Sequence, residues 1–365
     1  HWADPSKPLF EHELVRKSKE GTEARTRFRV RAMTPELARS LAKNTESAWN
    51  PADSEHMAQT LDKFFEQRSH GHPELLNVEY YAVTDDQNRP YGMTGLYTND
   101  IQGGAGFGTR DKLGPEHNLA VGLGWFVIDK EHQGTGVGGY LFNWTENLAR
   151  SRGAKFMFIE TDDDPNEESA VKLYEKRGYK KGFSVLGYFG PDRDLTTYTA
   201  KVPQEGIKEY VAKEQISESN SAELLDLAKN IYSKARFEEF AACLDLLLSR
   251  NPDEKAILMP QTFVQRDAQN HIAAFGITAN RVYENVVMNY WRGANPKVPG
   301  SQAELAACLK GLTRAQNREI LISAGEGDDP DFAATGFAKI GQEGISEAFE
   351  KNADIKLLLY TKQLR

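Results

Sequence analysis

The chain has 365 residues, with 45 Lys or Arg against 53 Asp or Glu, and a formal net charge of −8 at pH 7. This length predicts two domains, and a hydrophobic content of 39% is enough to bury a sizeable core. The acidic balance argues against a broad surface that grips nucleic acid. No apolar run is long enough to span a membrane and the first residues lack a signal-peptide core, so we expect a cytoplasmic protein without nucleic-acid or membrane partners.

The cysteines and histidines indicate neither a disulfide framework nor a metal centre. Cys243 and Cys308 each lie in an apolar helical pattern, where packing as a small buried side chain is the expected role. His70 and His72 resemble a metal-binding pair, but no third or fourth ligand follows at a suitable spacing. We therefore expect no metal and no disulfide.

The first half is expected to alternate strands and helices. The pattern RFRVRA from Arg27 to Ala32 predicts a strand with one buried face, and Thr34 predicts the N-cap of a helix that starts at Pro35. The other expected elements are helices over residues 55–67 and up to Gly178, and strands over residues 78–85, 90–98, 119–128, 155–160, 183–189 and 195–202. The last two strands are expected to pair antiparallel and to complete this half.

The second half repeats this order with two helices, three strands, a helix, a strand, a helix and a final strand. The closest local echo joins residues 160–182 to residues 323–345, because each has a strand, an acidic stretch containing Asp-Asp-Pro and a helix that ends in glycine. This predicts a tandem duplication. We expect a first domain over residues 1–202 and a second over residues 203–365.

A glycine-rich loop, QGTGVGG, stands between the apolar strand 119–128 and a helix with apolar residues at Val137, Leu141, Trp144 and Leu148. Its backbone N–H groups would converge at the start of that helix, which predicts a pyrophosphate site. No Gly-Lys-Ser/Thr follows as in a P-loop, and no acidic residue about 20 positions later ends a second Rossmann strand. Another glycine run, residues 103–108, precedes no obvious helix and is expected to be a loop on the substrate side.

The run from Gly124 to Lys181 resembles the GNAT acetyltransferase family. The strand piece FVID, the loop QGTGVG and the segment LYEKRGY follow one another in the order and at about the distances of that family. The resemblance implies an α/β (α+β) fold of two tandem GNAT-like domains, each a mixed, centrally splayed β-sheet flanked by helices. It also implies acetyl-CoA as cosubstrate and direct transfer of the acetyl group to a primary amine in a ternary complex.

The resemblance also assigns roles to single residues. Backbone groups of Phe126, Val127 and Ile128 would bind the pantetheine arm as a short extra strand. Tyr174 matches the general acid of the family, which reprotonates the coenzyme A thiolate, and Asn166 stands near the place of an Asn that contacts the acyl donor, with one extra residue before Tyr174. The pyrophosphate would be held by the amides of Gln133, Gly134, Thr135, Gly136, Val137, Gly138 and Gly139.

The general base is left open by the sequence. Many members of the family use a Glu on the strand before the loop, and the segment LAVGLGWF contains none. Glu116 and His117, just before that strand, and Glu160, at the end of the next one, are the candidates for activating the amine or contacting the substrate.

The second half is expected to be a degenerate copy. Pro296 and Pro299 stand where the first half has its glycine loop, and proline has no N–H to donate. Aligning FAKIG with YEKRG sets Phe337 opposite Tyr174, which removes the hydroxyl of a general acid. Catalysis is therefore expected in the first half only, and the second half would serve structure, the substrate site or a partner surface.

The acceptor is expected to be a small cationic amine, such as a polyamine, an amino acid or an amino sugar, because the acidic run Asp162 to Asp164 follows the strand on the acceptor side. A protein or peptide amine is the alternative within the enzyme class. An acyl-CoA-binding sensor or scaffold without turnover is the alternative outside it. Both a monomer and a homodimer remain open.

Overall fold

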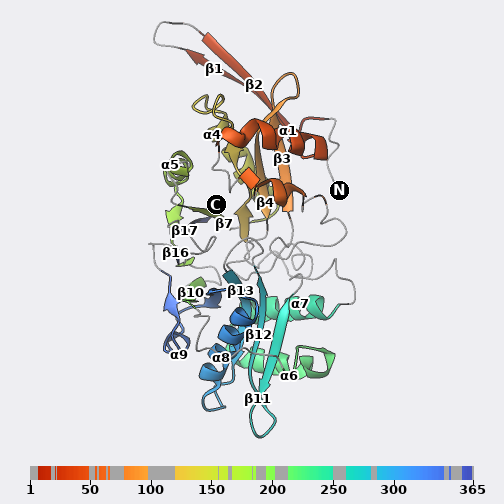
Figure 1. The fold of residues 1–365 in the computed structure, drawn as a ribbon, viewed down its shortest axis with the longest axis vertical. Coiled ribbons are helices and arrows are strands. Elements are labelled where there is room, and N and C mark those ends of the chain that lie inside the picture. The colour runs from red at the N-terminus through yellow and green to blue at the C-terminus, as the bar shows by residue number, and fades with distance from the viewer. Residues whose placement is uncertain are drawn as a thin grey trace.

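A computed structural model describes residues 7–17, 21, 23–48, 54–55, 57–62, 65, 78–97, 120–154, 156–162, 167–182, 184–185, 195–201, 213–249, 260–280, 286–340, 345–346 and 356–363. Two mixed β-sheets flanked by helices form its centre, the first in the upper half of Figure 1 and the second in the lower half. This is the α/β class that the sequence predicts. Among the described helices, none combines the length and the apolar character needed to cross a membrane.

The first sheet has the strand order β1-β2-β3-β4-β5-β7-β17-β16, with β6 beside β4 and β8 beside β17. Strands β5 and β7 run parallel, and the other neighbours are antiparallel. The strands are β1 (Phe10–Lys17), β2 (Glu23–Ala32), β3 (Val78–Thr84), β4 (Pro90–Tyr97), β5 (Ala120–Leu123), β6 (Val127–Ile128), β7 (Phe156–Asp162), β8 (Lys180–Lys181), β16 (Ile345–Ser346) and β17 (Lys356–Gln363).

The second sheet has the order β11-β12-β13-β14-β10-β15, with β9 beside β10. Its run β11-β12-β13-β14 repeats β3-β4-β5-β7 of the first sheet, and again the last two strands of the run are parallel. The strands are β9 (Ser184–Val185), β10 (Leu195–Lys201), β11 (Gln261–Arg266), β12 (Ile272–Asn280), β13 (Val286–Ala294), β14 (Ile320–Glu326) and β15 (Ala338–Lys339).

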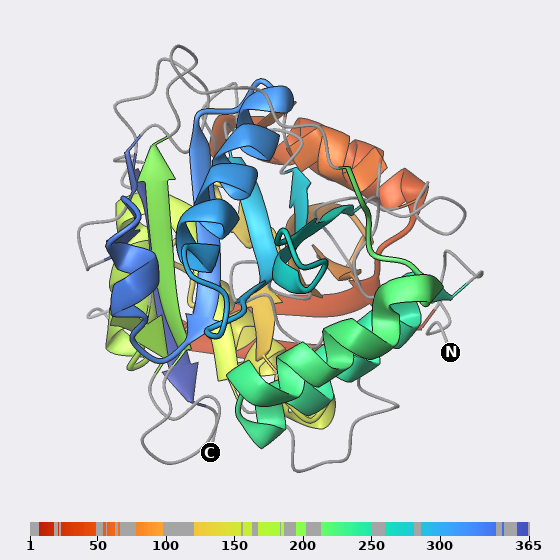
Figure 2. The ribbon, with the colours of Figure 1, turned by 90° about the horizontal axis from the view of Figure 1, so that it is seen from below.

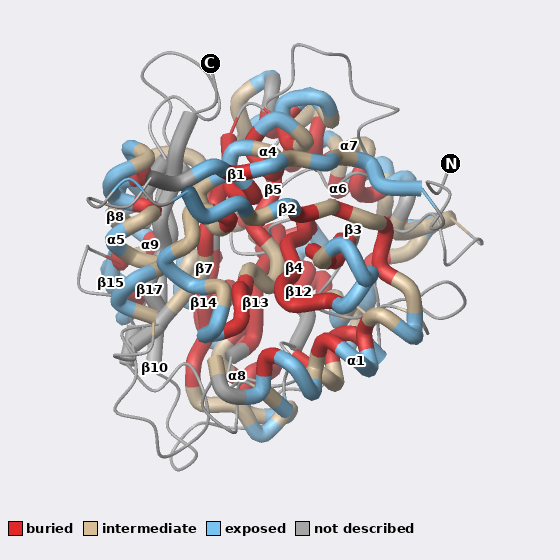
Figure 3. The backbone as a smooth tube through the Cα atoms, turned by 90° about the horizontal axis from the view of Figure 1, so that it is seen from above, coloured by how far each residue is buried: buried red, intermediate tan, exposed pale blue. Residues whose placement is uncertain are grey.

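Helices cover both faces of each sheet. On the first sheet, α1 (Pro35–Thr45), η1 (Glu46–Ala48) and the helical residues 57–62 pack on one face, while α4 (Val137–Ser151) and α5 (Glu168–Lys176) pack on the other. On the second sheet, α6 (Glu218–Ile231) and α7 (Lys234–Leu248) oppose α8 (Ser301–Ala315) and the short α9 (Pro330–Ala333), as Figure 2 shows for α8. Central strands are the most buried, and β4 is buried along its whole length (Figure 3).

Local sequence signals set several of these elements. The Thr34 hydroxyl accepts a hydrogen bond from the Leu37 N–H at 3.2 Å, and Pro35 opens α1, so the predicted helix start is confirmed. In α4 the apolar residues Val137 and Leu141 are fully buried against the sheet. Both cysteines are buried in their helices, as the apolar patterns predict.

Each half gives its last hairpin to the sheet of the other half. Strand β10 lies between β14 and β15, with Thr199 opposite Ile322, and β17 lies between β7 and β8, with Thr361 opposite Phe158. The predicted antiparallel pairing of β9 with β10 is confirmed, but the prediction that they complete the first half is wrong. Pattern identifies a strand and not its partner, which is chosen by long-range pairing. The predicted domain boundary at residue 202 lies outside the described residues.

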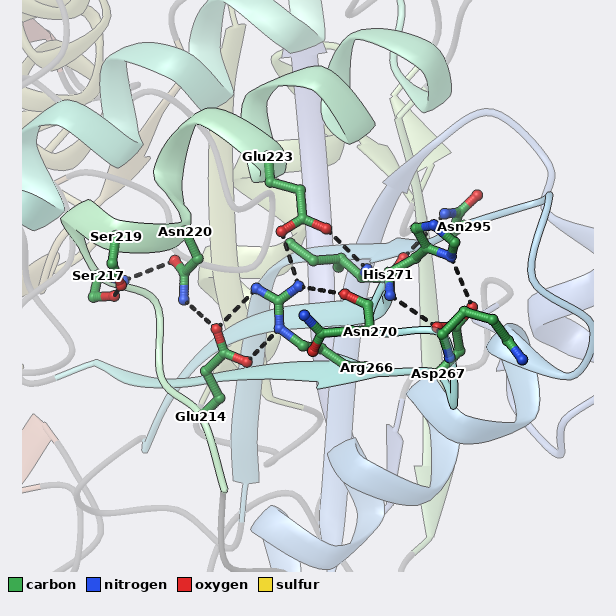
Figure 4. Close-up of polar contacts among 12 residues, drawn as sticks. Glu214, Ser217, Ser219, Asn220, Glu223, Arg266, Asp267, Asn270, His271 and Asn295 are labelled. Atoms are coloured by element: carbon green, nitrogen blue, oxygen red, sulfur yellow. Dashed lines mark hydrogen bonds and ion pairs between the residues drawn. The ribbon is translucent and has the colours of Figure 1, made fainter.

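The same type of turn occurs in both sheets, which supports the predicted duplication. The turn 85–89 (DDQNR) joins β3 to β4, and the turn 267–271 (DAQNH) joins β11 to β12. In both, one oxygen of the first Asp accepts backbone hydrogen bonds from the residues two and four positions later, at 2.8 and 2.9 Å in the first turn and at 2.9 and 2.8 Å in the second. Asn88 and Asn270 have φ of 61° and 69°, a region that asparagine tolerates. Figure 4 shows the second turn, tied to α6 through Arg266 and Glu223.

Three elements differ from the sequence predictions. The stretch 119–128, predicted as one strand, is interrupted between β5 and β6, where the Gly124 N–H donates to the Gly95 carbonyl at 2.8 Å. Strand β1, at the edge of the first sheet, was not predicted. The helix that the sequence predicts within residues 323–345 is reduced to α9 followed by a turn.

Candidate active site

The centre of the first sheet opens where β6 and β7 diverge. Parallel pairing between β5 and β7 runs from Ala120 opposite Phe156 to Gly122 opposite Phe158. Beyond Phe158, the described strand that pairs with β7 is β17, on its other side, while β6 pairs with β4. The backbone on the β7 side of β6 therefore has no strand partner among the described residues. An extended ligand could add there as a further strand.

Glycines shape the strand interruption that creates this opening. A Cβ on Gly122 would lie 2.5 Å from the ring of Tyr97, and a Cβ on Gly124 would lie 2.8 Å from the ring of Tyr80. Real side chains never approach that closely, so both positions need glycine for the tyrosine rings to lie flat on the sheet. Phe126 then turns to the opposite face and packs on Phe142, with ring centroids 5.7 Å apart.

The glycine loop follows β6 directly and ends at α4. Gly136 is the N-cap of α4 with φ of 93°, a left-handed conformation that favours glycine, and in the described structure no side chain caps this helix end. The first-turn amides of α4 have no partner within the helix and carry partial positive charge. Among the described residues, a Cβ on Gly138 would find only Ile128 within 4 Å, at 3.8 Å, so this part of the chain leaves the space before these amides open. The loop thus fits a phosphate group.

Side chains of the loop brace its own backbone. The Gln133 amide Nε2 donates to the Ile128 carbonyl at 2.9 Å, and the Thr135 hydroxyl donates to the His132 carbonyl at 2.5 Å. Asp129 accepts from the backbone N–H of His132 at 2.9 Å. These contacts hold residues 133–139 as a preformed cradle, the name used below for this loop and the first turn of α4.

His132, next to the cradle, contacts one aromatic and one acidic side chain. The ring of His132 stacks on Tyr91, with centroids 4.0 Å apart, and its Nδ1 lies 2.6 Å from Asp129. Burial, and after it the nearby carboxylates of Asp85 and Asp129, raise the pKa of Tyr91. Tyr91 therefore stays a neutral phenol under the loop.

Helix α5 brings Tyr174 to the opening from the α4 face. Its ring is 3% exposed and packs on Phe142, with centroids 5.7 Å apart. The same core cluster holds Leu123 at the end of β5 and Ile159 on β7, the two strands that border the opening.

The motif LYEKRGY contains a second tyrosine, and its hydroxyl has a separate partner. The Tyr179 hydroxyl donates to Glu146 of α4 at 3.1 Å. Burial and then Glu146 raise the pKa of Tyr179. The Tyr179 hydroxyl is therefore held by α4.

Glu160 lies on β7, two residues beyond the last pair with β5, and is half-buried. Alternation along the strand sets Glu160 on the face of Phe158, opposite the face of Ile159 and the Tyr174 cluster. The other predicted residues, His117 and Asn166, lie outside the described residues. So do Glu116, His70, His72, the run 103–108 and Asp163 and Asp164. Among the described residues no group of three or more His, Cys, Asp or Glu could hold a metal ion.

The second sheet contains the counterpart of this site. The Asp129 N–H donates to the Tyr91 carbonyl, and the Asn295 N–H donates to the Ala273 carbonyl, both at 2.8 Å. Helix α8 has 15 residues, as α4 has, and Gly300 is its N-cap with φ of 78°. The loop from Asn295 to Gly300 is two residues shorter than the loop of the first half, which spans Asp129 to Gly136. Counting back from Asn295 sets Arg292 at the place of Phe126.

The opening of the second sheet is filled by the side chain of Arg292. Parallel pairing of β13 with β14 extends to Asn289 opposite Ser323, and the strands then diverge as in the first sheet. The Arg292 guanidinium lies across this divergence: a Cβ on Gly325 of β14 would be 2.8 Å from its Nη2. It stacks 3.8 Å over the ring of Phe332 and pairs with Asp329 at 3.3 Å. A pantetheine arm would meet a fixed cation there.

The structure also corrects the alignment of α5, the helix that carries Tyr174, with its counterpart α9 in the second half. Gly178 and Gly336 follow these helices with φ of 83° and 91° and occupy equivalent places. Counting back from them sets Phe332, and not Phe337, opposite Tyr174. The hydroxyl is absent in the second half under either alignment.

Comparison with known proteins agrees with this site. The model of the acetyltransferase (GNAT) family matches residues 50–179. No curated protein matches the chain in sequence. The glucosamine N-acetyltransferase region of a fungal multi-domain GH3 β-N-acetylglucosaminidase is similar in fold, with a TM-score of 0.51 at 12% identity over 92% of this chain and 38% of that chain.

Two further solved structures span nearly the whole chain. A GCN5-related N-acetyltransferase from Sphaerobacter thermophilus has 12% identity and a TM-score of 0.45, over 93% of this chain and 96% of that one. A tandem GNAT protein from the clavulanic acid biosynthesis pathway has 10% identity and a TM-score of 0.47, over 93% and 99%. The family match covers the opening, the cradle and Tyr174, so residues 50–179 of this chain belong to the acetyltransferase (GNAT) family.

Proposed function

We propose that this chain is an acetyl-CoA-dependent N-acetyltransferase whose active site is the opening of the first sheet. The observation that carries the proposal is the continuity of two features, the unpaired edge of β6 and the uncapped cradle at residues 133–139. A pyrophosphate bound to the cradle amides would lead its pantetheine arm along Phe126 to Ile128. A simple phosphate site would need the cradle and not the strand edge.

The proposed chemistry assigns opposite sides of the opening to the acid and the base. The neutral amine nitrogen of the acceptor attacks the thioester carbonyl carbon, a C–N bond forms and the C–S bond breaks. Tyr174 gives its proton to the departing thiolate and regains one from solvent, and the proton lost by the amine goes to Glu160 or to water. Tyr174 and Glu160 lie on opposite faces of the sheet, so the donor and the acceptor would approach from different sides.

The proposed acceptor is a small cationic amine. Glu160, the acceptor-side carboxylate among the described residues, is half-buried, where its charge is less screened by solvent than on an open surface. The net charge of −8 also favours the approach of a cation over that of an anion.

The second half is proposed not to bind the coenzyme. Arg292 occupies the path that the pantetheine arm would follow, and Phe332 replaces the acid. The second half would then support the first through the exchanged strand β17, which pairs with β7 at the edge of the proposed site.

The proposal is tested by measuring thiol release from acetyl-CoA with polyamines, amino acids, amino sugars and short peptides. We expect turnover with at least one small amine and none with a peptide whose amines are blocked. Turnover with peptides alone would shift the acceptor to a protein. Coenzyme binding without turnover on any amine would refute the transferase and favour a sensor.

A further inference from the structure

Arg177 connects the C-terminal end of α5 to the first turns of α4. It follows α5 directly, and its Nη2 donates to the Gly139 carbonyl at 2.8 Å while its Nη1 donates to the Asn143 side chain. The guanidinium also lies over the ring of Phe142, 5.9 Å from the centroid. Gly139 belongs to the cradle, so this hydrogen bond joins the end of α5 to the backbone of the cradle.

The second half is an internal control for this contact. Its helices α8 and α9 also pack against each other, but the counterparts of Gly139, Asn143 and Arg177 are Ala303, Ala307 and Thr335, counted from Gly300 and Gly336. There Lys310 donates to the Thr335 carbonyl at 2.8 Å instead. The helix pair therefore forms without a guanidinium. The copy that has lost the cradle glycines and the acid has also lost the arginine.

We propose that Arg177 is a positioning residue. It holds α5 against the cradle so that Tyr174, on α5, meets the thiol of the bound coenzyme. Tyr174 lies three residues before Arg177 on α5, on a neighbouring part of the same helix surface. In the proposed site the cradle holds the pyrophosphate of the coenzyme, and α5 positions the proton donor Tyr174. A shift of about 1 Å between reacting groups can lower a rate by about a hundredfold. This inference rests on the proposed function.

The test is a double-mutant cycle between Arg177 and Tyr174. Arg177→Met keeps the aliphatic stem and removes both donors, and Arg177→Lys restores one of them. We expect Arg177→Met to lower kcat at saturating acetyl-CoA by about tenfold in the wild-type background and by less than about twofold in the Tyr174→Phe background, because the two residues act as one unit. Arg177→Lys should recover part of the loss.

Arg150→Met is the matched control, because Arg150 lies at the end of α4 away from the cradle and, like Arg177, donates to an asparagine of α4, here Asn147 at 3.1 Å. It should leave kcat unchanged. An equal loss of kcat from Arg177→Met in both backgrounds would overturn the inference and leave the proposed function standing. A loss confined to coenzyme affinity, with kcat intact, would also overturn it, because Arg177 would then hold the coenzyme itself.

The failure of the proposed function gives a different result. If Tyr174→Phe alone leaves kcat unchanged, the acid assignment fails whatever Arg177 does. Asn143→Ala is a second variant, because it removes one partner of the guanidinium from α4 and leaves Arg177 itself in place. Like Arg177→Met, it should lower kcat in the wild-type background and leave kcat unchanged in the Tyr174→Phe background. An equal loss of kcat in both backgrounds would count against the positioning role.

Discussion

The substitution Gly138→Ala should raise the free energy of unfolding and weaken coenzyme binding, so it tests the two contributions of Gly138 separately. Gly138 is the second residue of α4, and in the described part of the chain the added methyl would have Ile128 Cγ1, at 3.8 Å, as its one neighbour within 4 Å. Alanine is favoured over glycine in a helix interior by about 1 kcal/mol, and about half of that is expected in the first turn. The free energy of unfolding should therefore rise by about 0.5 kcal/mol and Tm by about 1 °C.

The same methyl should weaken coenzyme binding. It would stand between Ile128, at the end of β6, and the cradle amides, where the pyrophosphate is proposed to lead into the pantetheine arm. Losing one charge-assisted hydrogen bond costs about 1.5–3 kcal/mol, which weakens Kd by about tenfold to a hundredfold. Calorimetric titration with coenzyme A gives Kd, and denaturant unfolding without ligand gives the stability.

Gly153→Ala is the control at the other end of the same helix. Gly153 has φ of 78°, so an alanine there should lower the free energy of unfolding by about 1 kcal/mol and leave Kd unchanged. An unchanged Kd in Gly138→Ala would mean that the coenzyme does not pass over Gly138, and the cradle assignment would fail.

Three further expectations follow from the same geometry. Tyr174→Phe should lower kcat by about a hundredfold or more while Kd for coenzyme A stays within about twofold, which steady-state kinetics and calorimetry check; an equal loss in Kd would argue for a packing role. Calorimetry should find one coenzyme A per chain, because Arg292 fills the second opening, and two equal sites would contradict that assignment. Burial raises the pKa of Glu239 from 4.5 to about 7 against the opposing effect of Arg236, so the folded state binds this proton more tightly than the unfolded state. The free energy of unfolding should therefore decrease as pH rises from about 4.5 to about 7, and urea unfolding of Glu239→Gln should show a smaller decrease over that range; an identical pH profile would refute the reasoning.

The features that sequence predicts well are those encoded by neighbouring residues. Thr34 and Pro35 mark the start of α1 through contacts within one helical turn, and the glycines of the cradle mark the loop before α4. The catalytic assignment of Tyr174 came from a motif within the same short stretch, and it stays a proposal.

The features that sequence did not predict depend on contacts between distant residues. The interruption after Leu123 requires the rings of Tyr80 and Tyr97 from two other strands to press on glycines, which no local pattern encodes. Arg292 lies in an apolar strand pattern, and Arg177 follows Tyr174 in the motif LYEKRGY, so neither residue carries a local signal of its own role. The internal repeat was a usable signal for both, because the counterpart of each residue differs in kind between the halves.

The exchange of β10 and β17 links the two halves in time as well as in space. Phe158 is made about 200 residues before Thr361, the residue it faces, so the first sheet lacks both strands of the β16–β17 hairpin until β17 has been synthesised. During that interval β7 presents an open edge beside the proposed site. A nonsense mutation just before β17 would therefore damage the half that carries the cradle, although the lost strand is encoded in the other half.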